Sequence, residues 1–173
     1  MNTVRIASGK YRGRLVKTPG EGTHPMGERE RLALFNMISP ALESALVLDA
    51  FAGSGALGIE ALSRGAIKAV FVEKSPRAAR VIRENLANLG LKEGVITGKV
   101  SDFNTDERFG VILADPPYDD FRIAELSGLA KLLKNDGVLA LSHPGEAPEL
   151  TGLKLVKTNR YAGARISIYR RLF

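Results

Sequence analysis

The sequence predicts an α/β fold in which helices cover both faces of a mostly parallel sheet that has an antiparallel C-terminal edge. Short apolar runs alternate with helix-like stretches through the centre of the chain, which is typical of parallel strands joined by helices. The last two apolar runs are separated only by a turn, so we expect them to pair antiparallel to one another. Two short runs near the N-terminus flank a glycine-containing loop and predict a small β-hairpin.

The N-terminal region predicts a hairpin, a linker and a helix. Val4–Ala7 and Arg14–Val16 are the strand-like runs, with Tyr11 near the tip of the loop between them. Proline and glycine at positions 18–22 predict a linker, and apolar residues at helical spacing predict a helix over Glu28–Ile38. We therefore expect two units, a basic hairpin extension over residues 1–22 and a main domain over residues 23–173.

Strands and helices alternate in the central region. The best delimited helix has Ser75 as its N-cap, Pro76 at its first position and Gly90 just past its end. The predicted parallel strands are Leu46–Leu48, Ala69–Val72, Val111–Ala114 and Val138–Leu141, and the antiparallel pair is Leu153–Thr158 with Ala164–Tyr169.

Composition narrows the class of protein. The 173 residues carry 25 basic and 19 acidic side chains, which gives a net charge of +6. Hydrophobic residues make up 45% of the chain, a value that fits one compact globular domain. The absence of cysteine excludes disulfides, thiolate nucleophiles and cysteine-bound zinc, and with only two histidines we expect no metal site. No stretch resembles a signal peptide or a membrane helix, so we expect a cytoplasmic protein without membrane contact.

The positive charge is concentrated at the two ends of the chain. Residues 1–20 and residues 151–173 contain basic side chains and no acidic ones, whereas the middle of the chain is net acidic. Clustered cations attract polyanions and release their condensed counterions, so this distribution is typical of nucleic-acid binding. Solvated basic tails, or an arginine-rich transit peptide at the front, are the alternatives.

A glycine loop follows the first predicted parallel strand. It contains G-x-G-x-x-G at Gly53, Gly55 and Gly58, and Glu73 ends the next strand, where its carboxylate can accept from ribose hydroxyls. Dinucleotide and S-adenosylmethionine sites share this arrangement. Asp49 favours S-adenosylmethionine, because a carboxylate before the turn repels a pyrophosphate but suits an amino group and a sulfonium. The alternative is a turn used only for helix packing, with Asp49 as a cap.

An adenine contact is predicted just past a further likely strand, which lies between Ala69–Val72 and position 101. Asp102 offers an acceptor for an exocyclic amine beside the ring of Phe103, although acidic residues that cap loops are common. The candidate cofactor site comprises Asp49, Phe51, Ala52, Gly53, Ser54, Gly55, Glu73, Lys74, Asp102 and Phe103.

The tetrapeptide Asp115-Pro116-Pro117-Tyr118 follows a strand, at the edge where open α/β sheets bind ligands. An exocyclic amine of a base is a poor nucleophile because its lone pair is delocalised into the ring. If the Asp115 carboxylate and the Pro116 carbonyl accept its two N–H groups, the lone pair is directed at a methyl donor. The prolines fix that carbonyl, and Tyr118 would stack on the flipped base, worth ~1–3 kcal/mol. We predict Asp115, Pro116, Pro117 and Tyr118 as the catalytic group.

The same tetrapeptide also has other interpretations. Asp-Pro-Pro is a common strand terminator, but its position after a glycine loop with Asp49 and Glu73 favours the catalytic one. A DNA adenine-N6 methyltransferase would use the same residues, and a non-catalytic RNA-binding ribosome assembly factor could retain the pocket. A protein-glutamine methyltransferase is expected to have asparagine at position 115, and Asp49 disfavours a nicotinamide-dependent oxidoreductase.

These motifs together resemble the class I S-adenosylmethionine-dependent methyltransferases, and more closely the bacterial RsmD-like family of small-subunit rRNA guanine-N2 methyltransferases. The similarity is carried by residues 5–14, 34–36, 49–58, 60–66, 71–74 and 115–119. It implies a Rossmann-like fold with a seven-stranded sheet, S-adenosylmethionine as cofactor, and methyl transfer to N2 of one guanine in small-subunit rRNA within an assembling 30S particle. We expect a monomer.

The resemblance further implies that the basic hairpin helps to bind rRNA. Two departures from the family pattern concern the segment before the first helix: His24-Pro25-Met26 stands where Arg-Pro-Thr is usual, and Leu32 stands where an acid is common. Contacts from that segment to RNA or cofactor are therefore not assigned. The predicted RNA-binding residues are Arg5, Lys10, Tyr11, Arg12, Arg14 and Lys17.

Overall fold

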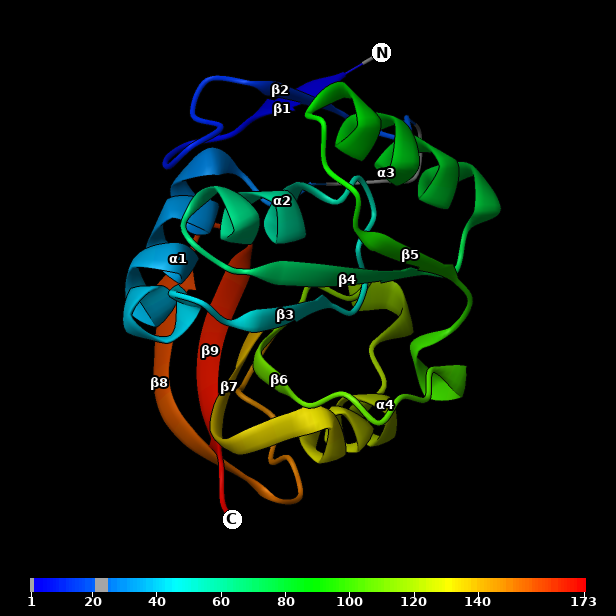
Figure 1. The fold of residues 1–173 in the computed structure, drawn as a ribbon. Helices are drawn as coiled ribbons and strands as arrows, with labels where there is room; N and C mark the ends of the chain where they lie inside the picture. The colour runs from blue at the N-terminus through cyan, green and yellow to red at the C-terminus, as the bar shows by residue number, and fades with distance from the viewer. Residues whose placement is uncertain (1, 21–24) are drawn as a thin grey trace.

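A computed structural model describes residues 2–20 and 25–173 of the chain. Its main sheet has seven strands in the order β5-β4-β3-β6-β7-β9-β8, of which the first five are mutually parallel and the last two are antiparallel to their neighbours (Figure 1). The predicted fold class is confirmed. The strands are β3 Leu46–Asp49, β4 Lys68–Glu73, β5 Gly94–Thr97, β6 Phe109–Ala114, β7 Leu133–His143, β8 Leu153–Tyr161 and β9 Ala164–Arg171.

Helices cover both faces of this sheet. Helices α1, α2 and α3 lie on one face and α4 lies on the other (Figure 1). Successive residues of the central strands alternate between two apolar clusters: Val47 packs toward α1 and α2, and Leu48 packs toward α4. No helix of the described residues is long and apolar enough to cross a membrane. The helices are α1 Glu28–Leu42, α2 Ala56–Ser63, α3 Pro76–Asn88 and α4 Ile123–Leu129.

Helix boundaries follow local signals in one case and tertiary packing in another. The Ser75 side chain accepts a hydrogen bond from the Ala78 amide, and Pro76 opens α3, as predicted. Helix α1 was predicted to end at Ile38 but continues to Leu42 and includes Pro40. Leu42 is fully buried in the core, and its packing outweighs the hydrogen bond that proline removes.

The N-terminal hairpin, β1 Thr3–Arg5 with β2 Leu15–Lys17, is packed on the domain and is not a free arm (Figure 1). The amides of Ala7 and Ser8 donate to the carboxylate of Glu60 in α2 at 2.9 and 3.1 Å. The side chains of Ile6 and Val16 are fully buried in the same apolar cluster as α1 and α2. Truncation of the hairpin would therefore open the core.

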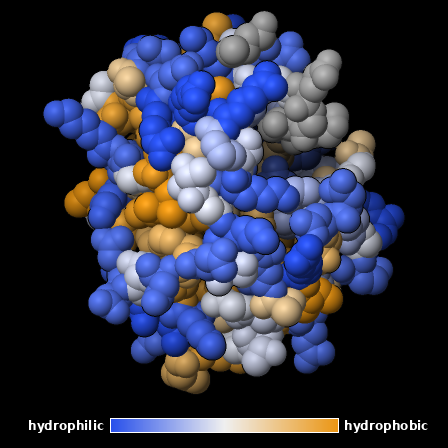
Figure 2. Space-filling view, turned by 90° about the vertical axis from the view of Figure 1, so that its right-hand side faces the viewer, coloured by the Kyte–Doolittle hydropathy of each residue, from blue (hydrophilic) through white to orange (hydrophobic). Residues whose placement is uncertain are grey.

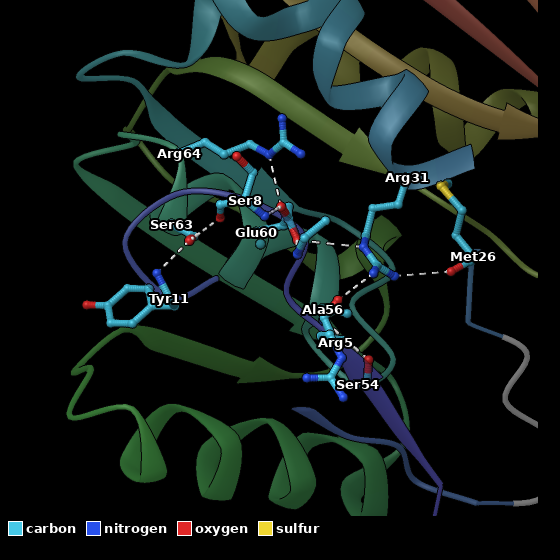
Figure 3. A network of polar contacts seen from close by, with 12 residues as sticks. Arg5, Ser8, Tyr11, Met26, Arg31, Ser54, Ala56, Glu60, Ser63 and Arg64 are labelled. Carbon is cyan, nitrogen blue, oxygen red and sulfur yellow. Dashed lines mark hydrogen bonds and ion pairs between the residues drawn. The ribbon is translucent and has the colours of Figure 1, made fainter. Parts of the chain in front are cut away.

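Glu60 also lies at the centre of a buried charge network (Figure 3). Arg64 donates from Nε to its carboxylate at 2.9 Å, and Arg31 of α1 approaches it at 3.7 Å. Arg31 in turn donates to the carbonyls of Arg5 and Met26, at 2.6 and 3.3 Å. Burial lowers the pKa of Arg31, and the Glu60 charge opposes that shift. One carboxylate thus joins the hairpin, α1 and α2.

Replacement of Glu60 by alanine should lower the free energy of unfolding by about 3–5 kcal/mol, because it leaves the buried guanidinium of Arg31 and two hairpin amides without their acceptor. Urea denaturation measures this change. Glu107→Ala is the matched control, since Glu107 pairs with Lys68 at the surface, and it should cost less than about 1 kcal/mol. Equal losses in the two variants would contradict a central role for Glu60.

Candidate active site

The candidate site lies where the strand order of the sheet reverses direction. Strand β3 pairs with β4 on one side and with β6 on the other, and a crevice opens beyond the carboxyl ends of such strands. A cleft of about 1670 Å³ occupies this position. Figure 2 looks onto the side of the molecule where β3 and β4 end, and hydrophilic side chains surround smaller apolar areas there. The cleft exceeds the roughly 300–1,000 Å³ of a typical small-ligand pocket, so it has room for more than one ligand.

The glycine loop connects β3 to α2 and supports one wall of the cleft. Gly55 precedes α2 with φ +82°, a left-handed conformation that a side chain would strain. A Cβ on Gly58 would lie 2.3 Å from the ring of Phe71, so this glycine allows α2 to pack on β4. The G-x-G-x-x-G pattern therefore serves both the turn and the helix packing.

Glu73 is held at the end of β4 by the glycine loop itself. Its Oε2 accepts a hydrogen bond from the Gly53 amide at 2.7 Å, and its Oε1 accepts one from the Ser75 amide at 2.9 Å. Each carboxylate oxygen retains a further lone pair. The side chain lines the cleft, so these oxygens can also accept from hydroxyl groups of a ligand.

Asp49 is fully buried at the end of β3. Its Oδ2 accepts from the Gly58 amide at 2.9 Å, whereas its Oδ1 has no hydrogen-bond partner. Burial raises the pKa of Asp49 to about 7, the charges of Asp115 and Glu73 add to the shift, and the Gly58 amide opposes it. An unpartnered carboxylate oxygen in such a place is costly, and a cationic ligand would relieve that cost.

The Asp115–Tyr118 segment follows β6 and forms the opposite wall of the cleft. Burial raises the pKa of Asp115 to about 6, and the hydroxyl of Ser142 opposes the shift. Tyr118 is 37% exposed, and its hydroxyl hydrogen-bonds the Ser142 hydroxyl at 2.5 Å. The ring is thus tied at its polar end while part of its surface stays open to the cleft.

Sequence reasoning did not identify Ser142. It lies near the end of β7, which pairs in parallel with β6, and this pairing brings it beside the tetrapeptide. The only local signal was its position directly after the apolar run that ends at Leu141. Glu30, Arg31 and Met26 also line the cleft, from α1 and the turn before it.

The structure brings most of the predicted cofactor residues to the cleft. Three of them are not on the cleft wall: Gly55 is the residue before α2, Asp49 is fully buried, and Asp102 is exposed in the short 3₁₀ turn Val100–Asp102. Predicted residues that line the cleft are Phe51, Ala52, Gly53, Ser54, Glu73, Lys74, Phe103, Asp115, Pro116, Pro117 and Tyr118.

The predicted RNA-binding residues lie on the hairpin, outside the cleft. The ring of Tyr11 is partly buried against the core, and the Lys10 ammonium lies 5.4 Å from its centroid. Of the two departures from the family pattern, Pro25 and Met26 line the cleft and Leu32 does not, whereas His24 lies outside the described residues. The basic hairpin residues with exposed side chains are Arg5, Lys10, Arg12, Arg14 and Lys17.

Sequence comparisons relate this chain to known proteins over most of its length. The family model described as Conserved hypothetical protein 95 matches residues 4–170. The Haemophilus influenzae protein named Ribosomal RNA small subunit methyltransferase D is 39% identical over 130 residues, which cover 70% of this chain and 67% of that one. YlbH of Bacillus subtilis is 32% identical over 186 residues, covering 97% and 99% of the two chains.

Solved structures agree with the sequence comparisons. The Escherichia coli protein yhhF superimposes with a TM-score of 0.88 at 28% identity, over 98% of each chain. The Thermus thermophilus protein TTHA0928 superimposes with a TM-score of 0.81 at 35% identity, over 95% of this chain and 98% of that one. With the family model spanning nearly all of its residues, and with the glycine loop and Asp-Pro-Pro-Tyr segment facing one cleft, this chain belongs to the RsmD-like family.

Proposed function

We propose that this chain transfers a methyl group from S-adenosylmethionine to the exocyclic N2 amine of a guanine in small-subunit rRNA. The observation that carries the proposal is the shared cleft, in which Glu73 and the glycine loop face Asp115–Tyr118. Relatives named as small-subunit rRNA methyltransferases support the reaction class and the RNA substrate. The substrate we infer is an assembling 30S particle, and we infer that the protein acts as a cytoplasmic monomer.

Residues on the cleft wall, together with the buried Asp49, suit S-adenosylmethionine. Glu73 would accept from the ribose hydroxyls, and the free Oδ1 of Asp49 supplies negative charge for the ammonium and sulfonium groups. Phe103 lines the cleft beyond β5, where it would contact the adenine. When bound, the cofactor supplies an activated methyl group on its sulfonium.

The residues after β6 prepare the target nitrogen. Asp115 and the carbonyl of Pro116 accept the two N–H groups of the exocyclic amine, which localises its lone pair on nitrogen. Pro116 is buried and flanked by Pro117, so the carbonyl is fixed before the base arrives. Tyr118, anchored through Ser142, stacks on the base. No residue has to remove a proton beforehand, because the nitrogen loses it after attack.

Labelled S-adenosylmethionine with undermethylated small subunits, naked rRNA or DNA tests the proposal. Nucleoside analysis of the products reports the polymer, the base and the atom together. We expect label in N2-methylguanosine, and only with rRNA or the particle. Label in N6-methyladenosine of DNA would establish the alternative DNA methyltransferase, and no label in any polymer would favour a non-catalytic assembly factor.

Replacement of Asp115 by alanine should lower the methyl-transfer rate constant at least about 10²-fold, because it removes an acceptor from the attacking nitrogen. Calorimetric affinity for S-adenosylmethionine should survive, since the glycine loop and Glu73 are intact. Asp106→Ala, which alters an exposed loop residue before β6, is the control and should have wild-type turnover. A fully active Asp115→Ala variant would exclude the mechanism.

Replacement of Asp49 by asparagine should weaken cofactor binding and raise the free energy of unfolding. The pKa of Asp49 is about 7 in the folded protein and ~3.9 in the unfolded chain, so the wild type loses stability as pH rises from ~4 to ~7. Asparagine resembles the protonated form. At pH 8 the variant should therefore unfold with a free energy on the order of 1–4 kcal/mol higher than the wild type, a difference that shrinks toward pH 4.

Urea denaturation of both proteins across this pH range measures the difference, and calorimetry measures cofactor binding. Binding of S-adenosylmethionine should weaken in the variant, because the neutral amide no longer offers a charge to the cation. Equal stability of the two proteins at pH 8 would show that burial imposes no cost on the Asp49 carboxylate. Unchanged cofactor affinity would remove its proposed role.

A further inference from the structure

A second, smaller groove continues from the cleft, between the start of α1 and the β8–β9 turn. Its volume is about 340 Å³, and Glu30 and Ala162 line both the groove and the cleft. The side chains that line only the groove are Arg29, Arg160 and Tyr161. The groove therefore continues from the cleft at Glu30. Burial raises the pKa of Tyr118, and the charge of Glu30 is close enough to contribute to that shift.

The side chains of both arginines in this groove are exposed. In the described part of the chain, neither Arg29 nor Arg160 takes part in an ion pair. Two other basic side chains, on α1 and β9, are engaged, by contrast: Arg31 pairs with Glu60, and Arg165 pairs with Glu146 and donates to a carbonyl. Two guanidiniums from distant parts of the sequence thus remain available in one groove.

Both arginines occupy positions that local electrostatics disfavours. Arg29 lies in the first turn of α1, where the helix dipole favours acids. Arg160 lies directly opposite Arg165 across β8 and β9, and like charges at paired positions destabilise a sheet. A charged side chain in a locally unfavourable position, with no partner in the protein to offset the cost, is typical of a binding site.

The groove combines two cations with one aromatic ring. Tyr161 is partly buried, packs on the core through its ring, and accepts a hydrogen bond from the Asn159 amide at 3.3 Å, so its orientation is fixed. A basic groove with an aromatic platform is the usual site for single-stranded nucleic acid. Glu30 is the acid among the lining residues, and its carboxylate folds back over Gly27 at the start of α1.

We propose that this groove binds the single-stranded RNA that flanks the methylated nucleotide. Arg29 and Arg160 contact its phosphates, and Tyr161 stacks on a neighbouring base. Residues 151–173 contain no acid, so β8 and β9 extend the same positive surface away from the groove. This inference rests on the proposed function, because it takes the Tyr118 side of the cleft as the place of the target base.

Binding of a short fluorescein-labelled single-stranded oligoribonucleotide, measured over a range of salt, tests the inference. Arg29→Gln and Arg160→Gln should each weaken binding about three- to tenfold and lower the slope of log K against log salt by about 0.7. Tyr161→Leu should weaken binding about tenfold, whereas Tyr161→Phe should retain it, because phenylalanine keeps the stacking ring. Lys92→Gln, at an exposed loop lysine before β5, is the charge-matched control and should change neither quantity.

Two further measurements separate this inference from the proposed function. With undermethylated small subunits, the groove variants should raise KM for the RNA and leave calorimetric affinity for S-adenosylmethionine unchanged. An unchanged salt slope and KM in an Arg29→Gln, Arg160→Gln double variant would overturn the groove assignment while methylation by the wild type still stood. Equal losses on an RNA duplex would overturn the single-strand assignment, and failure of the wild type to methylate any RNA would overturn the proposed function instead.

Discussion

Three carboxylates lie together at the ends of three neighbouring strands, and the chemistry proposed for the cleft depends on them. Asp49 and Glu73 end β3 and β4, Asp115 directly follows β6, and the parallel pairing of these strands brings the three side chains to one edge of the sheet. Burial raises the pKa of Asp49, the charges of Asp115 and Glu73 add to that shift, and burial also raises the pKa of Asp115. The fold thus keeps negative charge where solvent cannot stabilise it. A ligand with a cationic centre and several N–H or O–H donors would offset this cost when it binds, and the relief of that cost would add to its affinity.

The hairpin and the glycine loop are parts of one hydrogen-bonded assembly. Asn85 of α3 is buried, accepts from the Lys17 amide at 2.9 Å, and donates to the carbonyls of Lys17 and Ser54. Glu60 makes the equivalent connection at the other end of the hairpin, through Ala7 and α2. Two buried side chains therefore hold a basic surface element in a fixed position relative to the glycine loop. Pre-organisation of this kind would lower the ordering cost of binding the proposed cofactor and RNA.

The sequence predicted what local chemistry determines. The caps of α3, the glycine loop and the Asp115 tetrapeptide are contiguous signals; the structure has the predicted caps, and the loop and the tetrapeptide directly follow β3 and β6. The features that the sequence did not predict depend on contacts between residues far apart in the chain. Ser142 reaches Tyr118 only because β7 pairs with β6, and Arg160 meets Arg29 only because the β8–β9 turn returns beside α1. The end of α1 was missed for the same reason, since buried Leu42 overrides the proline signal.

The separation of charge also accounts for how, in the proposed complex, a polyanion would present one base to the carboxylates at the strand ends. In the proposed complex, phosphates would be attracted to the exposed cations of the hairpin and of β8 and β9, and the three carboxylates would repel them from the strand ends. A base edge is uncharged and has N–H donors, so it suits acceptors such as Asp115. The field of the protein therefore favours a nucleotide whose backbone stays outside while its base enters. Extrusion of a base from its stack costs a few kcal/mol, and in the proposed mechanism stacking on Tyr118 would offset part of this cost.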